Sequence, residues 1–363
     1  MSLSYPARLP LAQLPTPLQL LPRVSEAYGQ GQRIWVKRDD LTGAALSGNK
    51  LRKLEYVVAQ AQAEGCNTLI TCGGVQSNHC RATALVAAQL GLKTHLLLRG
   101  EHPAEIDGNL LLDYLAGARV SCYPKAQFQR EWPQLIQHWQ AHYAAQGDKA
   151  YAIPIGGSDG IGIWGYLNGA EELAGDMRTA GIARAHWVAA TGSGGTQAGL
   201  TLGALLHGAP AQVWGIAVCD DADYFRGKIK ADVSDWVARY QQLDAVPQLD
   251  INTVDDYVAP GYGRARPEVY ECIARVAALE GLVLDPTYTG KAFHGMLQEI
   301  KAGRFADRED IILIHTGGMF GLFPERHQFN FDHPHHPVRY AIEKLASTVA
   351  AESFTIRNRK KND

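Results

Sequence analysis

A run of glycine and hydroxyl residues between a predicted strand and a predicted helix gives the strongest chemical signal in the sequence. The run is Thr191-Gly192-Ser193-Gly194-Gly195-Thr196-Gln197. At the beginning of a helix the backbone N–H groups lack partners and the helix dipole is positive, which favours a phosphate group. Glycines let successive amides converge on the anion, and the hydroxyls of Ser193 and Thr196 add donors. The run therefore predicts a phosphate-binding loop.

The loop does not match two common phosphate-binding motifs. The dinucleotide fingerprint GxGxxG requires a glycine where Gln197 stands. The Walker pattern fails in the segment that begins at Gly43, because Asn49 precedes Lys50 and Leu51 follows it. A tight turn would explain a pair of glycines, but it explains three within four residues less well. An NAD-dependent enzyme and a P-loop NTPase are both disfavoured.

Two further glycine turns follow predicted strands in the same way. One spans residues 72–79 and contains Ser77 and Asn78, either of which suits the first position of the next helix. The other spans residues 315–320 and contains Thr316. In open α/β sheets, ligands bind beyond the carboxyl ends of the strands. We therefore expect the three glycine loops to line one site.

Lys50 has the chemistry to react with a carbonyl group. It lies at the beginning of a predicted helix, where the positive end of the dipole disfavours the ammonium form. Burial would act in the same direction and favour the neutral amine, which forms Schiff bases. By residue type alone, Lys37, Lys53 and Lys291 have equal claims, since lysine is usually a solvated charge. A lysine for a carbonyl and a loop for a phosphate together indicate pyridoxal phosphate (PLP).

An α/β fold is expected to position these groups. Short β-type segments alternate with amphipathic helices of ten to fifteen residues, a pattern typical of a parallel sheet. In a helix predicted at 50–64, apolar residues recur on one face, and Gly65 follows as a C-terminal cap. A second helix is predicted at 78–90. Strands are predicted at 68–72, 94–98, 186–190, 213–218, 281–284 and 310–315.

Length and composition narrow the class of protein. The 363 residues suffice for about two domains of roughly 150 residues each. A net charge of -2 argues against nucleic acid or an anionic membrane as the main partner, and no apolar run is long enough to span a bilayer. The first residues carry spaced prolines and do not resemble a signal peptide. The six cysteines form no CxxC pair and are expected to be buried free thiols in a reducing cytoplasm.

Five motifs in one order resemble the family of D-cysteine desulfhydrase and 1-aminocyclopropane-1-carboxylate (ACC) deaminase. They are KRDD at 37–40, SGNKLRKLE at 47–55, GVQSNH at 74–79, DPTYTGK at 285–291 and HTGG at 315–318. The resemblance runs from about residue 9 to residue 323. It implies the tryptophan-synthase-β-like PLP fold, a homodimer, and two open parallel-sheet domains with the cofactor in the cleft between them. The implied parts are a large PLP-binding domain (1–50 and 165–331), a small domain (51–164) and a C-terminal extension (332–363).

The resemblance also implies roles at the cofactor. Lys50 would bind the cofactor covalently and move the substrate proton, while Lys53 would approach the phosphate. Asn78 would bond the 3′-oxygen of PLP, and the substrate carboxylate would be received by Gln76, Ser77 and Asn78. The phosphate would be held by Gly192, Ser193, Gly194, Gly195 and Thr196.

Further positions bear on the reaction that the resemblance implies. Tyr288 and Tyr262 match active-site tyrosines of the family, and they complete the expected catalytic set with Lys50 and Ser77. Thr316 would face the pyridine nitrogen, where a neutral hydroxyl suits β-elimination better than transamination.

Thr289 is expected among the cofactor contacts, but it separates two activities of the family. The deaminases that open the cyclopropane ring resemble PVYEGK, with a glutamate after the tyrosine. Thr289 cannot supply that carboxylate, and the TGK form at 289–291 resembles the desulfhydrases. The sequence therefore predicts a PLP-dependent lyase, with D-cysteine as the best candidate substrate.

Alternatives stay open because three positions depart from the family pattern: Asp159, Asn109 and Cys80. One alternative is ACC deaminase activity, and another is a lyase for a different β-substituted alanine such as L-cysteate. A catalytically silent PLP-binding protein and a sugar-phosphate binder without PLP are the rivals from other classes. The expected binding partner is a small amino-acid substrate, and the expected location of the protein is the cytoplasm.

Two clusters of ligand-type side chains are interpreted without a catalytic or metal-binding role. The family uses the motif that contains Asp39 and Asp40 structurally. Prolines between the tail histidines favour a surface loop over a metal site, so no metal is expected. A helix is predicted at 338–351, followed by a frayed basic end. The histidines are His327, His333, His335 and His336.

Overall fold

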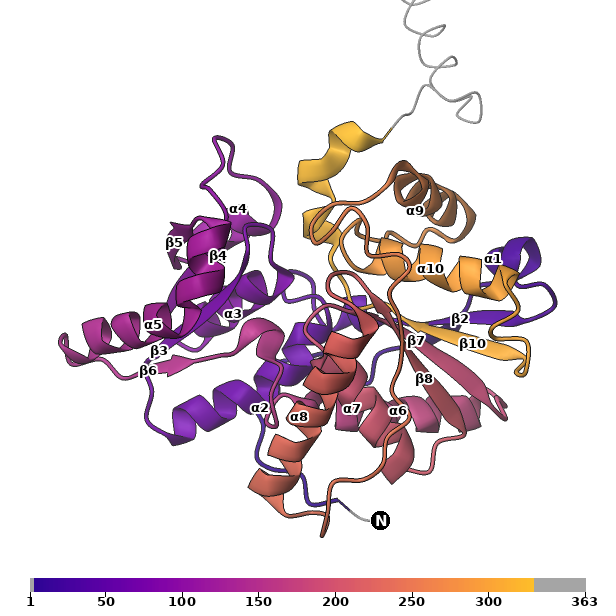
Figure 1. Ribbon diagram of the computed structural model, residues 1–363, viewed down its shortest axis with the longest axis horizontal. Helices are drawn as coiled ribbons and strands as arrows, with labels where there is room; N and C mark the ends of the chain where they lie inside the picture. The colour runs from indigo at the N-terminus through magenta and orange to yellow at the C-terminus, as the bar shows by residue number, and fades with distance from the viewer. Residues whose placement is uncertain (1–2, 330–363) are drawn as a thin grey trace, which may run out of the picture. The chain divides into compact units, whose positions relative to one another are not determined.

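Two open sheets, one of six strands and one of four, organise the part of the chain that the computed structural model describes, residues 3–329 (Figure 1). Apart from one antiparallel pair at the edge of the larger sheet, the neighbouring strands run parallel. In spatial order, the larger sheet contains β1 (Leu18–Leu20), β2 (Arg33–Lys37), β10 (Asp310–Ile314), β7 (Ala185–Thr191), β8 (Ala211–Ala217) and β9 (Asn252–Val254). The smaller sheet contains β5 (Arg119–Tyr123), β4 (Lys93–Arg99), β3 (Thr68–Gly74) and β6 (Ala150–Ala152).

Helices cover the faces of both sheets within residues 3–326, which form one compact unit. The helices are α1 (Pro22–Tyr28), α2 (Asn49–Ala63), α3 (Asn78–Gln89), α4 (Gly108–Leu115), α5 (Lys125–Ala144), α6 (Ile163–Thr179), α7 (Gly195–Leu206), α8 (Ala222–Tyr240), α9 (Pro267–Glu280) and α10 (Thr289–Lys301). Short 3₁₀ turns stand at Asp39–Leu41, Ile155–Gly157, Met319–Gly321 and Phe323–Gln328. In Figure 1, α1, α9 and α10 lie on one side of the larger sheet, and α6 and α7 lie on the other.

The core of the smaller sheet shows how the sequence selects these layers. Successive side chains of a strand point to opposite faces. On β4, Leu96 and Leu98 pack in a cluster with residues of α3 and α4, whereas Leu97 packs in a separate cluster with Phe128 and Tyr143 of α5. Because both faces of the strand are buried, its sequence is a continuous apolar run, as expected for a parallel sheet.

The predicted α/β class is confirmed, with one error among the predicted strands. Five of them correspond to β3, β4, β7, β8 and β10, and the two predicted helices correspond to α2 and α3. Residues 281–284 form no strand, although Leu282 and Leu284 are buried. These residues lead into the turn before α10, so burial without strand pairing explains their apolar character. The helix predicted at 338–351 and the histidines at 333, 335 and 336 lie outside the described residues.

A buried ion network holds α2 against α6 and against the segment that follows β2. The Arg52 guanidinium donates to Asp39 at 2.8 and 2.9 Å and to Glu172 at 3.0 Å. Tyr166 donates its hydroxyl to Asp39 at 2.7 Å. Burial acts to raise the pKa of Asp39, but the charge of Arg52 and the hydrogen bonds outweigh it, so the pKa is lowered. Asp39 therefore has a structural role, in agreement with the sequence-based interpretation.

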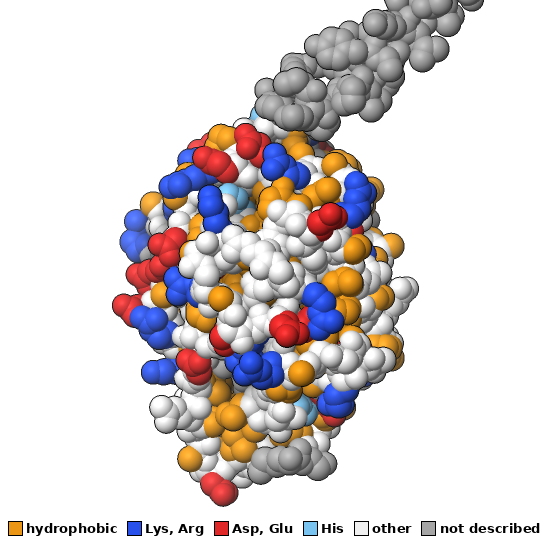
Figure 2. Space-filling model, turned by 90° about the vertical axis from the view of Figure 1, so that its right-hand side faces the viewer, with side chains coloured by type: hydrophobic (Ala, Val, Ile, Leu, Met, Phe, Trp, Pro, Cys, Tyr) orange, Lys and Arg blue, Asp and Glu red, His pale blue; other side chains and the backbone are white. Residues whose placement is uncertain are grey.

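The surface and the cysteines show no unusual chemistry. On the face drawn in Figure 2, basic and acidic side chains are interspersed, in keeping with the net charge of -2. All six cysteines are free thiols, and four of them are buried. Within residues 3–329, no helix is both long and apolar enough to cross a membrane.

Replacing Asp39 with Asn should lower the free energy of unfolding by about 3–5 kcal/mol, because Arg52 would lose a buried charged partner. Since the folded-state pKa of Asp39 is lowered, its contribution is present at neutral pH and is lost as the pH falls through the acidic range. Denaturant unfolding at pH 7 measures the change.

The matched control is Glu131→Gln, because the Glu131–Arg130 pair is exposed, with 36% and 69% of the side chains accessible. Such an exposed pair contributes little to stability. Equal losses in the two variants would contradict the structural role of Asp39.

Candidate active site

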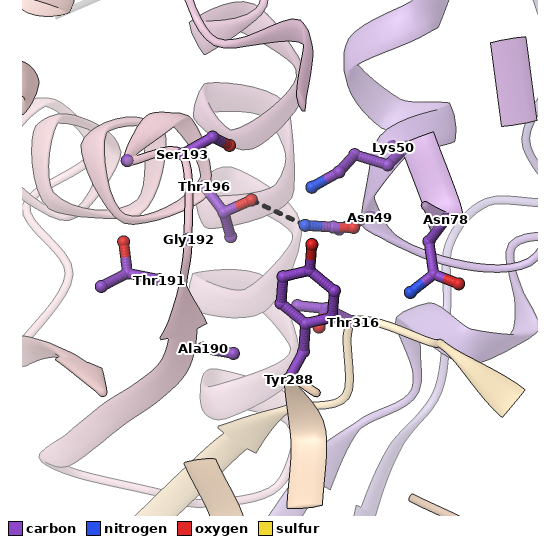
Figure 3. Close-up of a pocket in the computed structure, with 11 residues that line it drawn as sticks. Asn49, Lys50, Asn78, Ala190, Thr191, Gly192, Ser193, Thr196, Tyr288 and Thr316 are labelled. Carbon is purple, nitrogen blue, oxygen red and sulfur yellow. Dashed lines mark hydrogen bonds between the residues drawn. The ribbon is translucent and has the colours of Figure 1, made fainter. Parts of the chain in front are cut away.

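A cavity lies where the N-terminal ends of several helices meet the carboxyl ends of parallel strands (Figure 3). Asn49 and Lys50 begin α2, Asn78 begins α3, and Tyr288 immediately precedes α10. Helix N-termini carry unpaired N–H groups and partial positive charge. The lining residues are Asn49, Lys50, Asn78, Ala190, Thr191, Gly192, Ser193, Gly194, Thr196, Tyr288 and Thr316. The three predicted glycine loops each contribute to this lining.

The amine of Lys50 lies in this cavity without a hydrogen bond or ion pair to any described residue. Its Nζ stands 6.0 Å from the centre of the Tyr288 ring. Desolvation lowers the pKa of Lys50 to about 8. A neutral amine is therefore accessible near physiological pH, and burial is the cause.

The predicted phosphate loop lies between β7 and α7, with Gly194 as the residue before the helix. Ser158, from the turn before α6, accepts from the Gly195 N–H at 3.2 Å and contacts the Ser193 hydroxyl at 2.8 Å. Thr191 is 2% exposed, and its hydroxyl has no partner among the described residues. A buried, unpaired hydroxyl is costly unless a ligand satisfies it.

Lys53 lies behind this loop and shares a face of α2 with Lys50. Its ammonium is fully buried and donates to the Gly156 carbonyl at 3.2 Å and to the Ser158 hydroxyl at 3.1 Å. Burial, together with the charge of Lys50, holds the pKa of Lys53 well below its usual value. No carboxylate of the described chain forms an ion pair with it, so an anion at the loop would be its natural partner.

Asn49 connects three segments around the cavity, and the dashed line in Figure 3 marks one of its bonds. Its side-chain amide donates to the Thr196 hydroxyl at 2.9 Å, and its backbone N–H donates to the Thr316 carbonyl at 3.2 Å. Gly48 makes this approach feasible, because it has φ +111° and a Cβ there would lie 2.7 Å from the Thr316 carbonyl oxygen.

Tyr262 and Tyr288 face each other, with 2.7 Å between their hydroxyl oxygens. Desolvation raises the pKa of Tyr288 well above its usual value and that of Tyr262 to about 12. The Arg99 guanidinium lies over the Tyr262 ring, 5.2 Å from its centre. Both phenols are therefore protonated at neutral pH and can act as donors.

Six predicted site residues do not line the cavity: Lys53, Gln76, Ser77, Gly195, Tyr262 and Thr289. Ser77 caps α3 by accepting from the Cys80 N–H, and Gln76 is bonded to the backbone of Asp107 and Asn109. The contact expected between Thr289 and the cofactor stays a prediction. The Thr289 hydroxyl donates to the Asp285 carboxylate at 2.7 Å and accepts from the Asp285 N–H at 2.8 Å, so it is used within its own turn.

Sequence reasoning missed several residues that shape the site. Asn109 donates its side-chain amide to the Asn78 side chain at 3.0 Å and thereby orients a lining residue. Ser158 organises the phosphate loop, as described above, and Asn49 joins it to α2. By contrast, the Asp159 carboxylate accepts from the N–H groups of residues 161 and 162 and does not line the cavity. The departure from the family pattern at Asp159 is therefore a turn feature.

The described residues fit a phosphorylated aldehyde such as PLP. The unpaired Thr191 hydroxyl, the Lys53 ammonium and the α7 N-terminus suit a phosphate dianion. The Lys50 amine suits the aldehyde, and the Thr316 hydroxyl and the Asn78 amide are available for polar groups of a ring.

Comparisons with known proteins agree with this fit. The model of the family described as pyridoxal-phosphate dependent enzyme matches residues 9–317. A Thermotoga maritima protein named putative 1-aminocyclopropane-1-carboxylate deaminase is 40% identical over 88% of this chain and 98% of its own length. A Salmonella newport D-cysteine desulfhydrase is 41% identical over 87% of this chain and 95% of its own length.

A solved structure of a related protein has the same fold. The crystal structure of an ACC deaminase homologue superimposes with a TM-score of 0.80 and 34% sequence identity, covering 89% of this chain and 95% of the other. The predicted tryptophan-synthase-β-like PLP fold is thereby confirmed.

Replacing Lys50 with Ala should abolish the visible absorbance that PLP acquires on joining a protein amine, and it should lower turnover at least about a hundredfold. Absorbance spectra and the rate of amino-acid turnover measure the two effects. Lys125→Ala is the matched control, since Lys125 begins α5 on the exposed surface. A Lys50→Ala protein that keeps its colour and turnover would overturn the assignment.

The rate at which PLP recombines with the apoprotein should rise with pH and level off above about pH 8. Attack on the aldehyde requires the neutral amine, and the lowered pKa of Lys50 makes it prevalent above that value. Stopped-flow absorbance at a series of pH values gives the midpoint. A midpoint near the ordinary lysine value of 10.5 would contradict the desolvation of Lys50.

Proposed function

Since this chain belongs to the family of PLP-dependent enzymes that contains D-cysteine desulfhydrase and ACC deaminase, we propose that it is a β-elimination lyase for a small amino acid. The best candidate substrate is D-cysteine, which with water gives pyruvate, sulfide and ammonia. The observation that carries the proposal is the chemical character of the cavity. Amine, amide and hydroxyl groups line it, and no Asp or Glu of the described residues does.

PLP, when bound, supplies an aldehyde that joins amines and a pyridine ring that withdraws electrons from the bonds of the substrate Cα. Thr316 would offer a neutral hydroxyl to the pyridine nitrogen. Without a lining carboxylate to keep a proton on that nitrogen, the electron withdrawal is limited. This favours loss of a group from Cβ over transamination.

Lys50 is the proposed base at the substrate Cα. Desolvation brings its pKa to about 8, so a substantial fraction of the amine is neutral near physiological pH. An ordinary lysine would be almost entirely protonated there. The absence of a bonded partner among the described residues leaves the amine able to move between the cofactor and the proton.

Tyr288 and Tyr262 are the proposed acids at the leaving group. Burial keeps both phenols protonated, and the hydrogen bond between them leaves one hydroxyl proton available to a third group. A departing thiolate needs a proton, and a base and an acid with pKa values shifted apart suit elimination. Ser77 and Gln76, with Asn78, are proposed to receive the substrate carboxylate at the beginning of α3.

The choice of D-cysteine over ACC rests on position 289. A ring-opening deaminase resembles PVYEGK, whereas Thr289 here carries no carboxylate and is bonded to Asp285. Relatives named for both activities are similarly identical to this chain, at 40% and 41%. The substrate is therefore proposed from the residue, and not from the relatives. A homodimer in the cytoplasm, with domains 1–50 plus 165–331 and 51–164, belongs to the same proposal.

Release of the 2-oxo acid by the purified holoenzyme tests the proposal, with pyruvate measured from D-cysteine, L-cysteine and L-cysteate and 2-oxobutanoate measured from ACC. We expect release from D-cysteine at a kcat/KM at least about tenfold above the other three. Faster release from ACC would show that Thr289 does not discriminate between the two activities. Faster release from L-cysteate would show that the preferred leaving group is not sulfide. No release from any of them, with PLP bound, would favour the silent PLP-binding protein.

A further inference from the structure

Lys291 is a fully buried lysine in the first turn of α10 that the proposed reaction does not use. Its ammonium donates to the carbonyl oxygens of Val258 at 2.9 Å and Gly261 at 2.8 Å. A longer contact of 3.5 Å reaches the carbonyl of Val218, immediately after β8. The side chain thus ties α10 to the loop of residues 258–263, which we call the Tyr262 loop.

The bonds of Lys291 are charge-assisted, and no acidic partner competes for them. Among residues 3–329, no carboxylate forms an ion pair with Lys291. Desolvation lowers the pKa of Lys291 to about 8, so most of the side chain is still charged at neutral pH. Hydrogen bonds from a charged donor are about twice as strong as neutral ones, and these carbonyls would otherwise lose their donor.

The same loop and helix carry the two phenols that face each other at the cavity. Tyr262 follows Gly261 directly, and Tyr288 stands three residues before Lys291. The two rings pack at 77° with their centres 5.8 Å apart, and their hydroxyls are hydrogen-bonded. Lys291 therefore fixes the backbone beside Tyr262 to α10, the helix that Tyr288 immediately precedes.

Tyr262 also touches the ends of strands in the smaller sheet. A Cβ on Gly74 at the end of β3 would lie 3.0 Å from the Tyr262 ring, and Arg99 at the end of β4 stacks on that ring. The backbone position of Tyr262 thus decides whether its hydroxyl meets Tyr288. Loops held by few bonds sample many positions, and a misplacement of about 1 Å can cost a hundredfold in rate.

We propose that Lys291 is a positioning residue that holds the Tyr262 loop so that the Tyr262 hydroxyl stays against Tyr288. This inference rests on the proposed elimination only for its effect on rate. The proposal that Lys291 holds the Tyr262 loop in place does not depend on which reaction the protein catalyses.

Hydrogen–deuterium exchange of the PLP-loaded protein, measured without substrate, tests whether Lys291 holds the Tyr262 loop in place. In Lys291→Met, which keeps the length but removes the donors, the amides of residues 258–264 should exchange at least about tenfold faster. Those of residues 192–197 and the visible absorbance of the cofactor should not change. Lys301→Met, on the exposed end of α10, is the matched control and should behave as the parent protein. Unchanged exchange at 258–264 in Lys291→Met would overturn the proposal.

A double-mutant cycle tests the effect on rate, with the substrate found to release pyruvate. Lys291→Met and Tyr262→Phe should each lower kcat more than they raise KM. The double variant should be no more than about threefold slower than the slower single variant, because both changes remove the same hydroxyl contact. Lys291→Arg, which keeps the charge, should recover part of kcat and should also report on the hold if Lys291→Met does not fold. Losses that multiply in the double variant would contradict a role through Tyr262.

The two proposals can fail separately. If the parent protein releases no pyruvate from any tested amino acid, the proposed elimination fails, while the exchange measurement still decides whether Lys291 holds the loop. If exchange is unchanged but pyruvate is released, the elimination stands and the role of Lys291 is wrong.

Discussion

The two hydrogen bonds of Asn49 set the geometry on which the rest of the site depends. They join the first residue of α2 to Thr196 of α7 and to the Thr316 carbonyl after β10. The next residue along α2 is Lys50, so its amine is placed opposite the phosphate loop by the bonds of its neighbour. One buried hydrogen bond contributes only about 1 kcal/mol to stability. The two bonds of Asn49 are therefore important mainly because they fix the positions of three segments relative to one another.

Burial of the side chains around the cavity governs their protonation states. Lys50 and Lys53 are three residues apart and therefore share a face of α2, whereas Arg52 faces the ion network around Asp39 and Glu172. The carboxylates of Asp39 and Glu172 pair with Arg52, and no Asp or Glu of the described residues lines the cavity. A desolvated amine loses its proton easily, a phenol keeps its proton, and an anion is attracted. These protonation states suit the roles proposed for Lys50, Tyr262 and Tyr288.

The sequence was sufficient to predict what depends on local pattern. Glycine loops after apolar strands and a lysine at a helix start were predicted to meet at one site, and residues of all three loops line one cavity with Lys50. What depends on tertiary contacts was missed: Asn49 meets Thr196 across 147 positions, and Ser158 meets Ser193 across 35. The hydrogen bond between Thr289 and Asp285 is a further tertiary detail that the position of Thr289 in a motif does not reveal. Likewise, an apolar run such as 281–284 indicates that its residues are buried, but it does not show whether they pair with a neighbouring strand.

The most direct measurement is to reduce the PLP-loaded protein with borohydride and to map the modified residue by peptide mass spectrometry. Reduction makes the bond between PLP and its lysine permanent, so the label identifies the amine that the site presents. The account predicts that the label is found on the peptide containing Lys50, with none on Lys53 or Lys291, whose ammonium groups are bonded to carbonyl oxygens. A label mainly on Lys53 or Lys291 would contradict the central claim that the free, desolvated amine of Lys50 holds the cofactor.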